Sequence, residues 1–503
     1  MTVDNRWVNL IIYMKYFIIN LGFIVLMLLI SSLVSTFGQQ PFPAFPPKEV
    51  TNTMDRDKML YQMGIKLPDL PPKTEDKNAP PNVWPVDKSK PEGNWTDSKK
   101  NTITRSPFGL WNNYSDKSSG FFPGPDSARL GDYIPIDLLK MKNGKAIKSP
   151  KQWWKKQRPE IMKDLQEQLY GKIPDAADNL AVKWNIATSE GETDNAKYIQ
   201  KEITGEIDIS GYPEVRNRPV LSATLRVPAN SSSRVPVMII FGGFGNVLDI
   251  YWKIASPHGW GVCVYKLQTL QPDNGAGLTS YLIGLVNKGN WRKPDDWGTL
   301  LAWGWGVSRL IDYLETDPGV DSRRIGLTGH SRYGKATLVT MAFETRVAIG
   351  FPSDAGSLGT KLNRRHWGQD LENSTAASEY HWMAGSFFKW TGELIPGQYL
   401  PRKIEECPVD AHSLLALCAP RPVFINGGTN STWCDPYGMY LTAKYASPVY
   451  ELLGKEALVM PDQRPEIDKA YISGTIAYRY HKGGHTDVPD WPSFFEFAEN
   501  KLK

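Results

Sequence analysis

The stretch RRIGLTGHSRYGKATLVTMAF, residues 323–343, predicts a strand that turns sharply into a helix. An apolar run of strand type leads up to Gly329, and the residues after Ser331 have the composition of a helix. Ser331 therefore lies at the turn between them. It is either the N-cap of the helix or a nucleophile that projects from a tight turn, and Gly329 supplies the small residue that such a turn needs.

The segments around this unit repeat the alternation of strand and helix. Residues 297–315 predict a helix with one apolar side, and residues 180–228 alternate apolar and polar residues, which predicts antiparallel strands at a sheet edge. We expect an α/β fold, a three-layer sandwich with a mostly parallel central sheet and helices on both faces. The other predicted strands lie within the stretches 235–243, 260–267, 347–353 and 421–428, and the last lies at the start of the stretch 474–485.

The chain divides into three parts by composition. Residues 1–38 contain a lysine, an apolar stretch and a run of small residues, which predicts a signal peptide and a secreted or periplasmic protein; an uncleaved anchor is the alternative. Residues 39–130 are rich in Pro, Lys, Asp and Asn and predict an extended arm that wraps the main body. A flexible linker is the alternative, but Trp84, Trp95 and Trp111 favour docking. Residues 131–503 are the expected catalytic domain, whose first helix runs from Ser149-Pro150 to Gly171.

The composition also excludes several classes of protein. The net charge of +5 comes without a basic cluster interleaved with aromatic residues, so we expect no nucleic-acid partner, whereas an acidic polysaccharide is compatible. The four cysteines form no C-x-x-C pair and predict neither a zinc site nor a disulfide scaffold, and Cys263 and Cys418 lie in apolar runs typical of buried thiols. We expect no metal or cofactor, no stable membrane association after signal cleavage, and a monomer.

A serine nucleophile needs a base, and the order of the chain selects one histidine. In α/β-hydrolases the serine comes first, then the acid, then the histidine. Of the seven histidines, only His481 and His485 follow the last predicted strand. Gly483-Gly484 form a loop that can bring His485 to the serine, so His485 is the predicted base and His481 a structural residue. His330 adjoins the serine on a turn that is expected to direct its ring away.

Two strand ends offer an acid that could orient the imidazole. Asp354 lies just past a strand, in a position suited to a buried, hydrogen-bonded carboxylate, and we favour it. Asp435 precedes Pro436 in an ordinary Asp-Pro turn and stays the alternative acid. Oxyanion donors are expected at the start of the helix after the serine, and Gly242 and Gly243, at the end of an earlier strand, are suited to a second donor.

The sequence GHSRYGK at 329–335 resembles the signature G-[CH]-S-R-x-G-K of the glucuronoyl esterases, carbohydrate esterase family 15, and the likeness is to a bacterial branch of that family. The resemblance implies an α/β-hydrolase that cleaves esters of 4-O-methyl-glucuronic acid, found where glucuronoxylan is bonded to lignin. It runs from about residue 143 to the C-terminus and includes KLNRRHWGQ (361–369), HSLLALCAPRPVFI (412–425) and HKGGHTDVPDW (481–491).

The resemblance also implies roles for the residues that match the family's pattern. Arg332 matches the arginine that donates to the oxyanion, Lys335 the lysine that contacts sugar hydroxyls, and Trp433 the tryptophan that lines the uronate pocket. The family's acid often lies 23 residues after the serine, a position that Asp354 occupies here.

Three positions depart from that pattern. Many members have an acid two residues before the pocket tryptophan, where this chain has Ser431. Many have a sugar-binding glutamate where this chain has Gln369, which is the predicted substrate-binding residue at that position. The segment SGEGG of related sequences is AGSLG here, with Ser357 at the glutamate position. The departures leave a triad possible and the sugar specificity open.

The leading hypothesis is a secreted, metal-free serine esterase that cleaves uronate esters in polysaccharide or lignin–carbohydrate material. Ser331, His485 and Asp354 would form its triad, with Arg332 assisting. An acetyl-xylan or feruloyl esterase would use the same machinery on another ester, but Arg332 and Lys335 favour a negatively charged or hydroxyl-rich acyl group. The third possibility is a catalytically silent carbohydrate-binding protein that keeps the fold.

Overall fold

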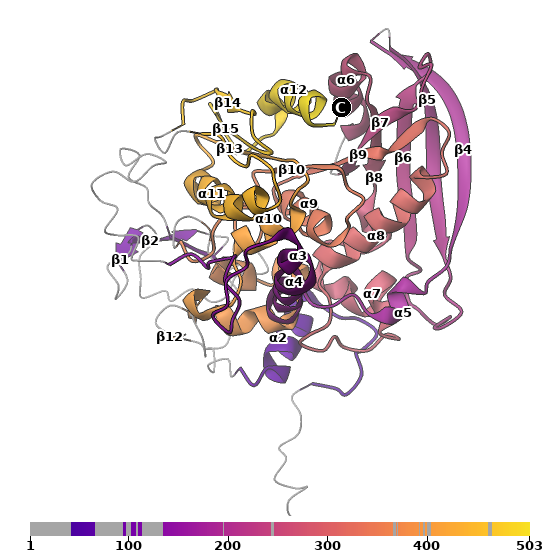
Figure 1. The fold of residues 1–503 in the computed structure, drawn as a ribbon. Coiled ribbons are helices and arrows are strands. Elements are labelled where there is room, and N and C mark those ends of the chain that lie inside the picture. The colour runs from indigo at the N-terminus through magenta and orange to yellow at the C-terminus, as the bar shows by residue number, and fades with distance from the viewer. Residues whose placement is uncertain are drawn as a thin grey trace, which may run out of the picture. The chain divides into compact units, whose positions relative to one another are not determined.

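The computed structural model has a ten-stranded mixed sheet at its centre (Figure 1). Residues 48–503 form one compact unit. The predicted signal peptide, residues 1–38, lies outside the described residues. The structure describes residues 42–65, 134–194, 196–242, 246–365, 369, 371–391, 404–460 and 465–502, together with five short strands between 94 and 112 and between 393 and 399.

Six neighbouring strands of the sheet run parallel, as the alternation of strand and helix predicts. Their order is β15, β13, β10, β9, β7 and β8, and β14 pairs antiparallel with β15 at one edge. At the other edge β6, β5 and β4 are antiparallel, which confirms the prediction for residues 180–228. The strands are β4 (Val182–Thr193), β5 (Ala196–Ile207), β6 (Val220–Pro228), β7 (Val235–Phe241), β8 (Gly261–Tyr265), β9 (Val320–His330), β10 (Ile349–Ser353), β13 (Val423–Gly428), β14 (Ala470–Tyr471) and β15 (Ile476–His481).

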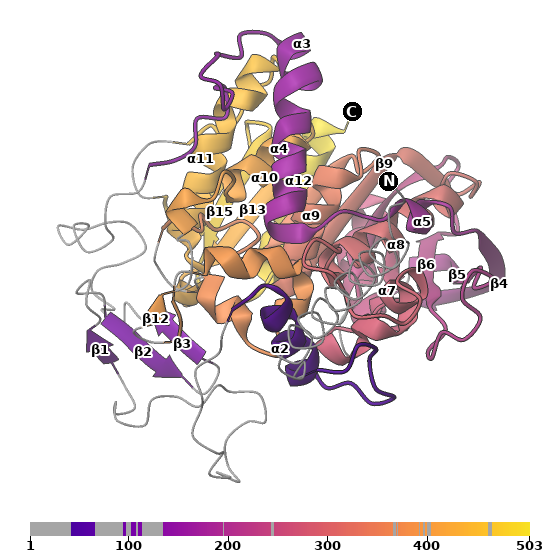
Figure 2. The ribbon, with the colours of Figure 1, turned by 90° about the horizontal axis from the view of Figure 1, so that it is seen from below.

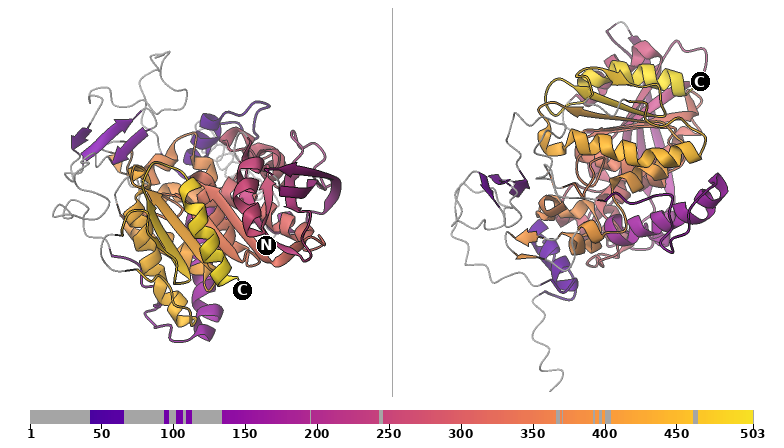
Figure 3. Two further views of the ribbon diagram at one scale, coloured as in Figure 1. Left: turned by 90° about the horizontal axis from the view of Figure 1, so that it is seen from above. Right: turned by 60° about the vertical axis from the view of Figure 1, so that its left-hand side comes forward.

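Helices cover both faces of this sheet. In β7, Val237 and Ile239 enter one hydrophobic core, while Met238 and Ile240 point to the opposite face and enter a second. The expected three-layer α/β-hydrolase sandwich is therefore confirmed (Figure 1, Figure 3). The first core takes side chains from α8 (Thr299–Leu314), α9 (Arg332–Phe343), α10 (Ala411–Cys418) and α11 (Pro436–Leu452), and the second from α6 (Val247–Ala255) and α12 (Trp491–Lys501).

The helical segment that opens the predicted catalytic domain begins and ends where the sequence indicates. The Ser149 hydroxyl accepts a hydrogen bond from the Gln152 N–H, and Pro150 takes the first helical position. Gly171 ends the segment with φ +83°, a conformation that glycine adopts at little cost. The segment consists of α3 (Pro150–Gln152), a π-helical turn (Trp153–Gln157), α4 (Arg158–Leu165) and a second π-helical turn (Gln166–Tyr170).

A helix interrupts the segment that the sequence predicts to be an extended arm. Helix α2 (Asn52–Gln62) buries Met59 and Leu60. The Tyr380 hydroxyl donates a hydrogen bond of 2.6 Å to Asp55 in this helix, so α2 is packed against the body of the unit (Figure 2). The prediction of an extended chain is wrong for α2, because a short helix that is stabilised by tertiary contacts has little signature of its own.

The remaining elements are short. All four cysteines are free and buried, which confirms the prediction for Cys263 and Cys418. Within the described ranges, no helix combines the length and the apolar character that crossing a membrane requires. The short elements are α5 (Asp175–Asp178), α7 (Tyr281–Val286), β1 (Asn94–Thr96), β2 (Thr102–Ser106), β3 (Gly109–Asn112), β11 (Glu393–Ile395), β12 (Gln398–Tyr399), and the 3-10 turns Ser256–His258, Leu267–Thr269, Gly275–Thr279, Leu371–Thr375, Tyr380–Trp382, Gly385–Trp390, Ile404–Glu406, Thr432–Cys434 and Val488–Asp490.

Candidate active site

Ser331 alone makes the connection between β9 and α9. Strand β9 ends at His330 and helix α9 begins at Arg332. The Ser331 backbone has φ +60° and ψ −123°, a strained conformation for a residue with a side chain, and the side chain does not cap the helix. These features fit a nucleophile on a tight turn and do not fit an N-cap serine.

Two glycines let this turn pack against its surroundings. A Cβ atom on Gly329 would lie 2.5 Å from the Tyr333 carbonyl oxygen, and a Cβ on Gly334 would lie 2.5 Å from the Ser353 carbonyl oxygen. The Ser331 N–H donates to that same Ser353 oxygen at 2.9 Å. The second glycine stands one place later than in G-x-S-x-G because that is where α9 passes the end of β10.

His485 and Asp354 meet beyond the carboxyl ends of β15 and β10. His485 Nδ1 lies 2.7 Å from Asp354 Oδ2. Asp354 is fully buried, and its N–H donates to Asn426 Oδ1 at 2.9 Å. In the part of the chain that the structure describes, every hydrogen bond of His485 uses Nδ1. The carboxylate therefore orients the ring, and Nε2 makes no hydrogen bond in this part of the chain.

The His485 ring also lies next to the serine turn. Its centroid is 4.2 Å from that of His330, the residue directly before Ser331. Strand β9 continues through His330 and brings this ring against the loop after β15, and whether the ring points away from Ser331 stays a prediction. The contact between the two rings places His485 beside the turn that carries Ser331. Catalytic hydrogen bonds are often long before substrate binds, so this arrangement is compatible with a triad.

Asp435, the alternative acid, is engaged elsewhere. Its carboxylate accepts a hydrogen bond of 2.9 Å from Arg365 Nε, and both side chains are almost fully buried. Ser431, where related sequences have an acid, places its Oγ 3.2 Å from His485 Nδ1. The geometry thus favours Asp354 as the acid, with the Ser431 hydroxyl as a second neighbour of the same nitrogen.

The guanidinium of Arg332 is held beside the turn by Asp273. Arg332 Nη1 lies 3.0 Å from Asp273 Oδ2, and the guanidinium carbon lies 5.1 Å from the centroid of the Trp382 ring. The other carboxylate oxygen, Asp273 Oδ1, lies 2.9 Å from His381 Nε2 and accepts a hydrogen bond of 2.7 Å from Trp382 Nε1. Asp273 belongs to no sequence motif and was not among the predicted site residues. Its position nevertheless determines where the Arg332 guanidinium lies.

This cluster makes the stability of the protein depend on pH. Burial alone would raise the pKa of Asp273, but His381, Arg332 and Trp382 outweigh it and lower the pKa from 3.8 to about 2. The carboxylate therefore stabilises the folded state fully above pH 4, and this contribution is lost as the pH falls toward 2. We expect the stability advantage of the wild type over Asp273→Asn to shrink by about 2 kcal/mol across that window. Urea unfolding at a series of pH values measures the difference, and a pH-independent difference would contradict the assignment.

Of the two glycines predicted as oxyanion donors, Gly243 lies outside the described residues. The Gly242 N–H donates to the Tyr265 carbonyl at 2.8 Å, and a Cβ on Gly242 would lie 2.8 Å from the same oxygen. Gly242 is therefore required by the close packing of β7 against β8, and its N–H is not free for an oxyanion, contrary to the prediction. The first N–H groups of α9, which have no partner within the helix, are the backbone donors that the structure places next to Ser331.

Lys335 lies beneath the loop that follows Asp354. Its Nζ donates to the carbonyl oxygens of Ala355 and Ser357, both at 2.6 Å, and its side chain is almost fully buried. Burial lowers the pKa of Lys335 to about 8. An ammonium group has three N–H donors, and these two contacts use two of them.

Gln369 and Trp433 are joined through their backbones. The Gln369 N–H donates to the Trp433 carbonyl at 2.7 Å, and the Trp433 ring lies 5.1 Å from the ring of His485. Gln369 Nε2 donates to Glu379 Oε2 at 3.3 Å. The structure thus brings both residues to the site and adds Glu379, which the sequence analysis missed because no motif surrounds it.

One group of possible metal ligands is found in the described part of the chain. The ligand atoms of Asp354, Cys434 and His485 lie within 4.8 Å of one another. Burial raises the pKa of the Cys434 thiol well above its usual range, and a thiol must lose its proton to bind a metal. The His485 nitrogen in this group already pairs with Asp354. The contacts fit a hydrogen-bonded acid–base pair better than a metal centre.

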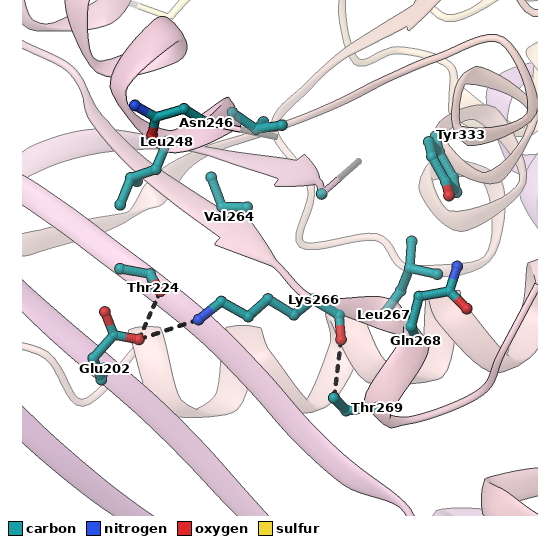
Figure 4. Close-up of a pocket in the computed structure, with 12 residues that line it drawn as sticks. Glu202, Thr224, Asn246, Leu248, Val264, Lys266, Leu267, Gln268, Thr269 and Tyr333 are labelled. Carbon is teal, nitrogen blue, oxygen red and sulfur yellow. Dashed lines mark hydrogen bonds and ion pairs between the residues drawn. The ribbon is translucent and has the colours of Figure 1, made fainter. Parts of the chain in front are cut away.

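A cavity of about 440 Å³ lies along β8. Figure 4 shows Val264 and Leu248 on its apolar side and the ion pair between Lys266 and Glu202, 3.3 Å long, at its edge. Of the predicted site residues that the structure describes, Gly242 alone lines this cavity. We therefore place the candidate active site at the Ser331 turn and not in the cavity.

Comparisons with known proteins agree with the fold and the signature. The family model "Glucuronyl esterase, fungi" matches residues 214–454. The carbohydrate esterase MZ0003, from an unknown prokaryotic organism, is 29% identical over 420 residues, which cover 75% of this chain and 91% of that protein. A 4-O-methyl-glucuronoyl methylesterase of Wolfiporia cocos is 29% identical over 276 residues, 52% of this chain and 61% of that protein.

Solved structures give a longer match. A CE15 glucuronoyl esterase from Teredinibacter turnerae is 31% identical, with a TM-score of 0.69 and coverage of 90% of this chain and all of that chain. A glucuronoyl esterase from Solibacter usitatus is 27% identical, with a TM-score of 0.65 and coverage of 75% and 100%. Fold and relatives together define a carboxylic ester hydrolase with the α/β-hydrolase fold. The chain belongs to carbohydrate esterase family 15, the glucuronoyl esterases.

Proposed function

We propose that this enzyme hydrolyses esters of a uronic acid, with Ser331 as nucleophile, His485 as base and Asp354 as the acid of the triad. The observation that carries the proposal is the 2.7 Å contact between His485 Nδ1 and Asp354 Oδ2 beside the Ser331 turn. The names of its relatives, which include 4-O-methyl-glucuronoyl methylesterases, support a glucuronate as the acyl group. An acidic plant or algal polysaccharide would present such an ester.

In the proposed reaction, Ser331 Oγ attacks the ester carbonyl carbon while His485 Nε2 takes the hydroxyl proton. The carbonyl electrons move to the oxygen, and the tetrahedral intermediate then collapses, breaks the bond to the alcohol and gives the alcohol the proton held by His485. A water that is deprotonated by His485 attacks the acyl-enzyme. Collapse of the second intermediate releases the uronate and returns the proton to Ser331. Asp354 stays ionised throughout and stabilises the imidazolium.

Arg332 is the proposed oxyanion donor, together with the first N–H groups of α9. Its side chain is 43% exposed, and Asp273 pairs with Nη1. A guanidinium has five N–H donors, so donors remain for an oxyanion. A positioned donor of this kind stabilises the transition state by some 3 kcal/mol on oxyanion-hole precedent. The Asp273 pairing keeps the guanidinium in place before substrate binds, so little reorganisation is needed during the reaction.

The remaining expectations concern the whole chain. We propose that residues 1–38 export the protein, that residues 39–130 form an arm that includes helix α2, and that residues 131–503 are the catalytic domain of a monomer. Contacts of α2 with the body of the unit support a docked arm, since Asn52 Oδ1 accepts a hydrogen bond of 2.8 Å from the Ala276 N–H.

A substrate panel tests the proposed function. We expect the purified enzyme to hydrolyse benzyl glucuronate with a kcat/KM at least about 100-fold above its values for acetylated xylan and methyl ferulate, because a site built to hold polar groups discriminates strongly against acyl groups without them. A preference for acetate or ferulate would assign the alternative esterase activity. No turnover, together with no labelling by a serine-directed phosphonate, would assign a silent carbohydrate-binding protein.

A further inference from the structure

One buried amide contacts the loop of the proposed acid and the loop of the proposed base. Asn426 lies in β13, the strand between β10 and β15, and its side chain is fully buried. Its Oδ1 accepts the hydrogen bond of 2.9 Å from the N–H of Asp354, which follows β10. Its Nδ2 donates at 3.4 Å to the carbonyl oxygen of Thr486, the residue directly after His485. A single side chain thus connects the two loops.

A third hydrogen bond fixes which way this amide faces. Asn426 Nδ2 also donates to Asp490 Oδ2 at 2.5 Å, and the Asp490 side chain is fully buried at the start of α12. A carboxylate and a carbonyl oxygen can only accept, whereas the backbone N–H of Asp354 can only donate. One orientation of the amide therefore satisfies all three partners, because a flipped amide would place its oxygen against two acceptors.

Two basic side chains hold the Asp490 carboxylate in place. Arg479 Nη1 donates to Oδ1 at 2.7 Å, and His481 Nδ1 lies 2.9 Å from Oδ2. The other ring nitrogen, His481 Nε2, lies 3.1 Å from the Gly484 carbonyl oxygen. Both nitrogens face oxygen atoms that accept, which requires an imidazolium with a proton on each nitrogen. Burial alone would lower the pKa of His481, but Asp490 and Gly484 outweigh it and raise the pKa.

The two loops depend on these contacts, since neither Asp354 nor His485 lies in a helix or a strand. Asp354 has φ +44°, a backbone conformation that costs free energy in a residue with a side chain and persists where surrounding contacts impose it. The two residues that flank His485 are held through their carbonyl oxygens, one by Asn426 and the other by His481. The buried network therefore fixes the backbone on both sides of the acid–base contact.

We propose that Asn426 is a positioning residue, which keeps the Asp354 carboxylate and the His485 imidazole at hydrogen-bond distance before substrate binds, while Asp490 keeps Asn426 in its orientation. The inference rests on the proposed function, because it takes Asp354 and His485 to be the acid and the base. Asn426 acts through the backbone of both loops and exchanges no proton. A carboxylate in its place would lose the two donated hydrogen bonds and repel Asp490.

A double-mutant cycle tests the proposal. Asn426→Ala removes all three hydrogen bonds, and we expect kcat on benzyl glucuronate to fall by about 10- to 100-fold with KM within about 3-fold, because a displaced acid–base pair slows the chemical step. In an Asp354→Asn background the same change should cost less than about 3-fold, since the acid that Asn426 positions is already lost. Equal losses in the two backgrounds would indicate a structural role only and would overturn the proposal.

Two further variants separate positioning from a general loss of stability. Gln157→Ala is the matched control: it removes another buried amide, whose Nε2 donates at 3.2 Å to the Lys140 carbonyl, and should lower the unfolding temperature without changing kcat. Asn426→Ser keeps a hydroxyl that can donate and accept, so it should lose less activity than Asn426→Ala, and it serves the same cycle if the alanine variant does not fold. A kcat of Asn426→Ser or Asn426→Ala equal to that of the wild type would contradict the inference.

A crystal structure of Asn426→Ala distinguishes failure of this inference from failure of the proposed catalysis. The distance from His485 Nδ1 to Asp354 Oδ2, 2.7 Å in the wild type, should exceed about 3.5 Å, beyond a hydrogen bond. If it does while Asp354→Asn keeps full turnover, the proposed triad falls and the role of Asn426 in holding these two side chains together stands. An unchanged distance overturns the inference whatever the turnover shows.

Discussion

Replacing Ser331 with alanine lowers kcat on benzyl glucuronate by about 10⁴-fold or more, to the edge of detection. This is the largest effect we expect, because removal of a triad nucleophile leaves only binding and oxyanion stabilisation to act on the ester. Ser331 also makes the entire connection between β9 and α9 with a strained backbone, so no neighbouring hydroxyl can take its place. Initial rates at saturating substrate measure the loss.

The matched control is Ser447→Ala. Ser447 Oγ bonds only to a carbonyl one turn earlier within α11, so its loss should leave kcat unchanged. Both variants should unfold at temperatures close to that of the wild type, since neither removes buried apolar area. A serine-directed phosphonate should label the wild type and Ser447→Ala but not Ser331→Ala. Residual activity of Ser331→Ala within tenfold of wild type would refute the nucleophile assignment.

Asp354→Asn is expected to lower kcat by about 10⁴-fold with little change in KM, which is the second largest effect. The neutral amide no longer stabilises the imidazolium and favours the wrong tautomer of His485, as precedent for triad aspartates indicates. The loss should be almost entirely in kcat, because Asp354 is fully buried behind the imidazole and does not face the substrate. Steady-state kinetics at several pH values measure it.

Asp435→Asn is the contrasting variant, since the same chemical change is made at the rival carboxylate. Asp435 bonds to Arg365, so the amide should lower the free energy of unfolding by roughly 1 to 3 kcal/mol and leave kcat of the folded enzyme within about threefold. If Asp435→Asn lost turnover and Asp354→Asn kept it, the acid would have to be reassigned. Equal, large losses in both would show that the two carboxylates act as a unit.

The elements of the fold could be predicted because they depend on local pattern. The run from Ile325 to Gly329, which β9 buries, carries no charge, and Ser149 and Gly171 mark the ends of their helical segment through capping chemistry that acts within a few residues. Helix α2 was missed because its stability comes from contacts such as the Tyr380–Asp55 hydrogen bond, made across more than 300 residues.

The residues of the candidate site likewise fall into those that the sequence predicts correctly and those that it does not. Ser331, Arg332 and Lys335 stand within five residues of one another on a strand-to-helix turn, and His485 follows the last parallel strand, so chain order alone leads to these residues. Gly242 was predicted from its glycine-rich neighbourhood, yet its N–H bonds to Tyr265 on the adjacent strand. A glycine that permits close strand packing and a glycine that exposes an amide look alike in a sequence.

By itself the sequence determined the alternation of strands and helices in the central sheet, the strand-to-helix turn at Ser331 and the family, because each depends on residues near one another in the chain. Only the tertiary structure decided which carboxylate faces His485, that Asp273 holds Arg332, and that Glu379 reaches Gln369. These are contacts between side chains from separate loops, and a loop's path is set by what it packs against. Local periodicity carries no information about that packing.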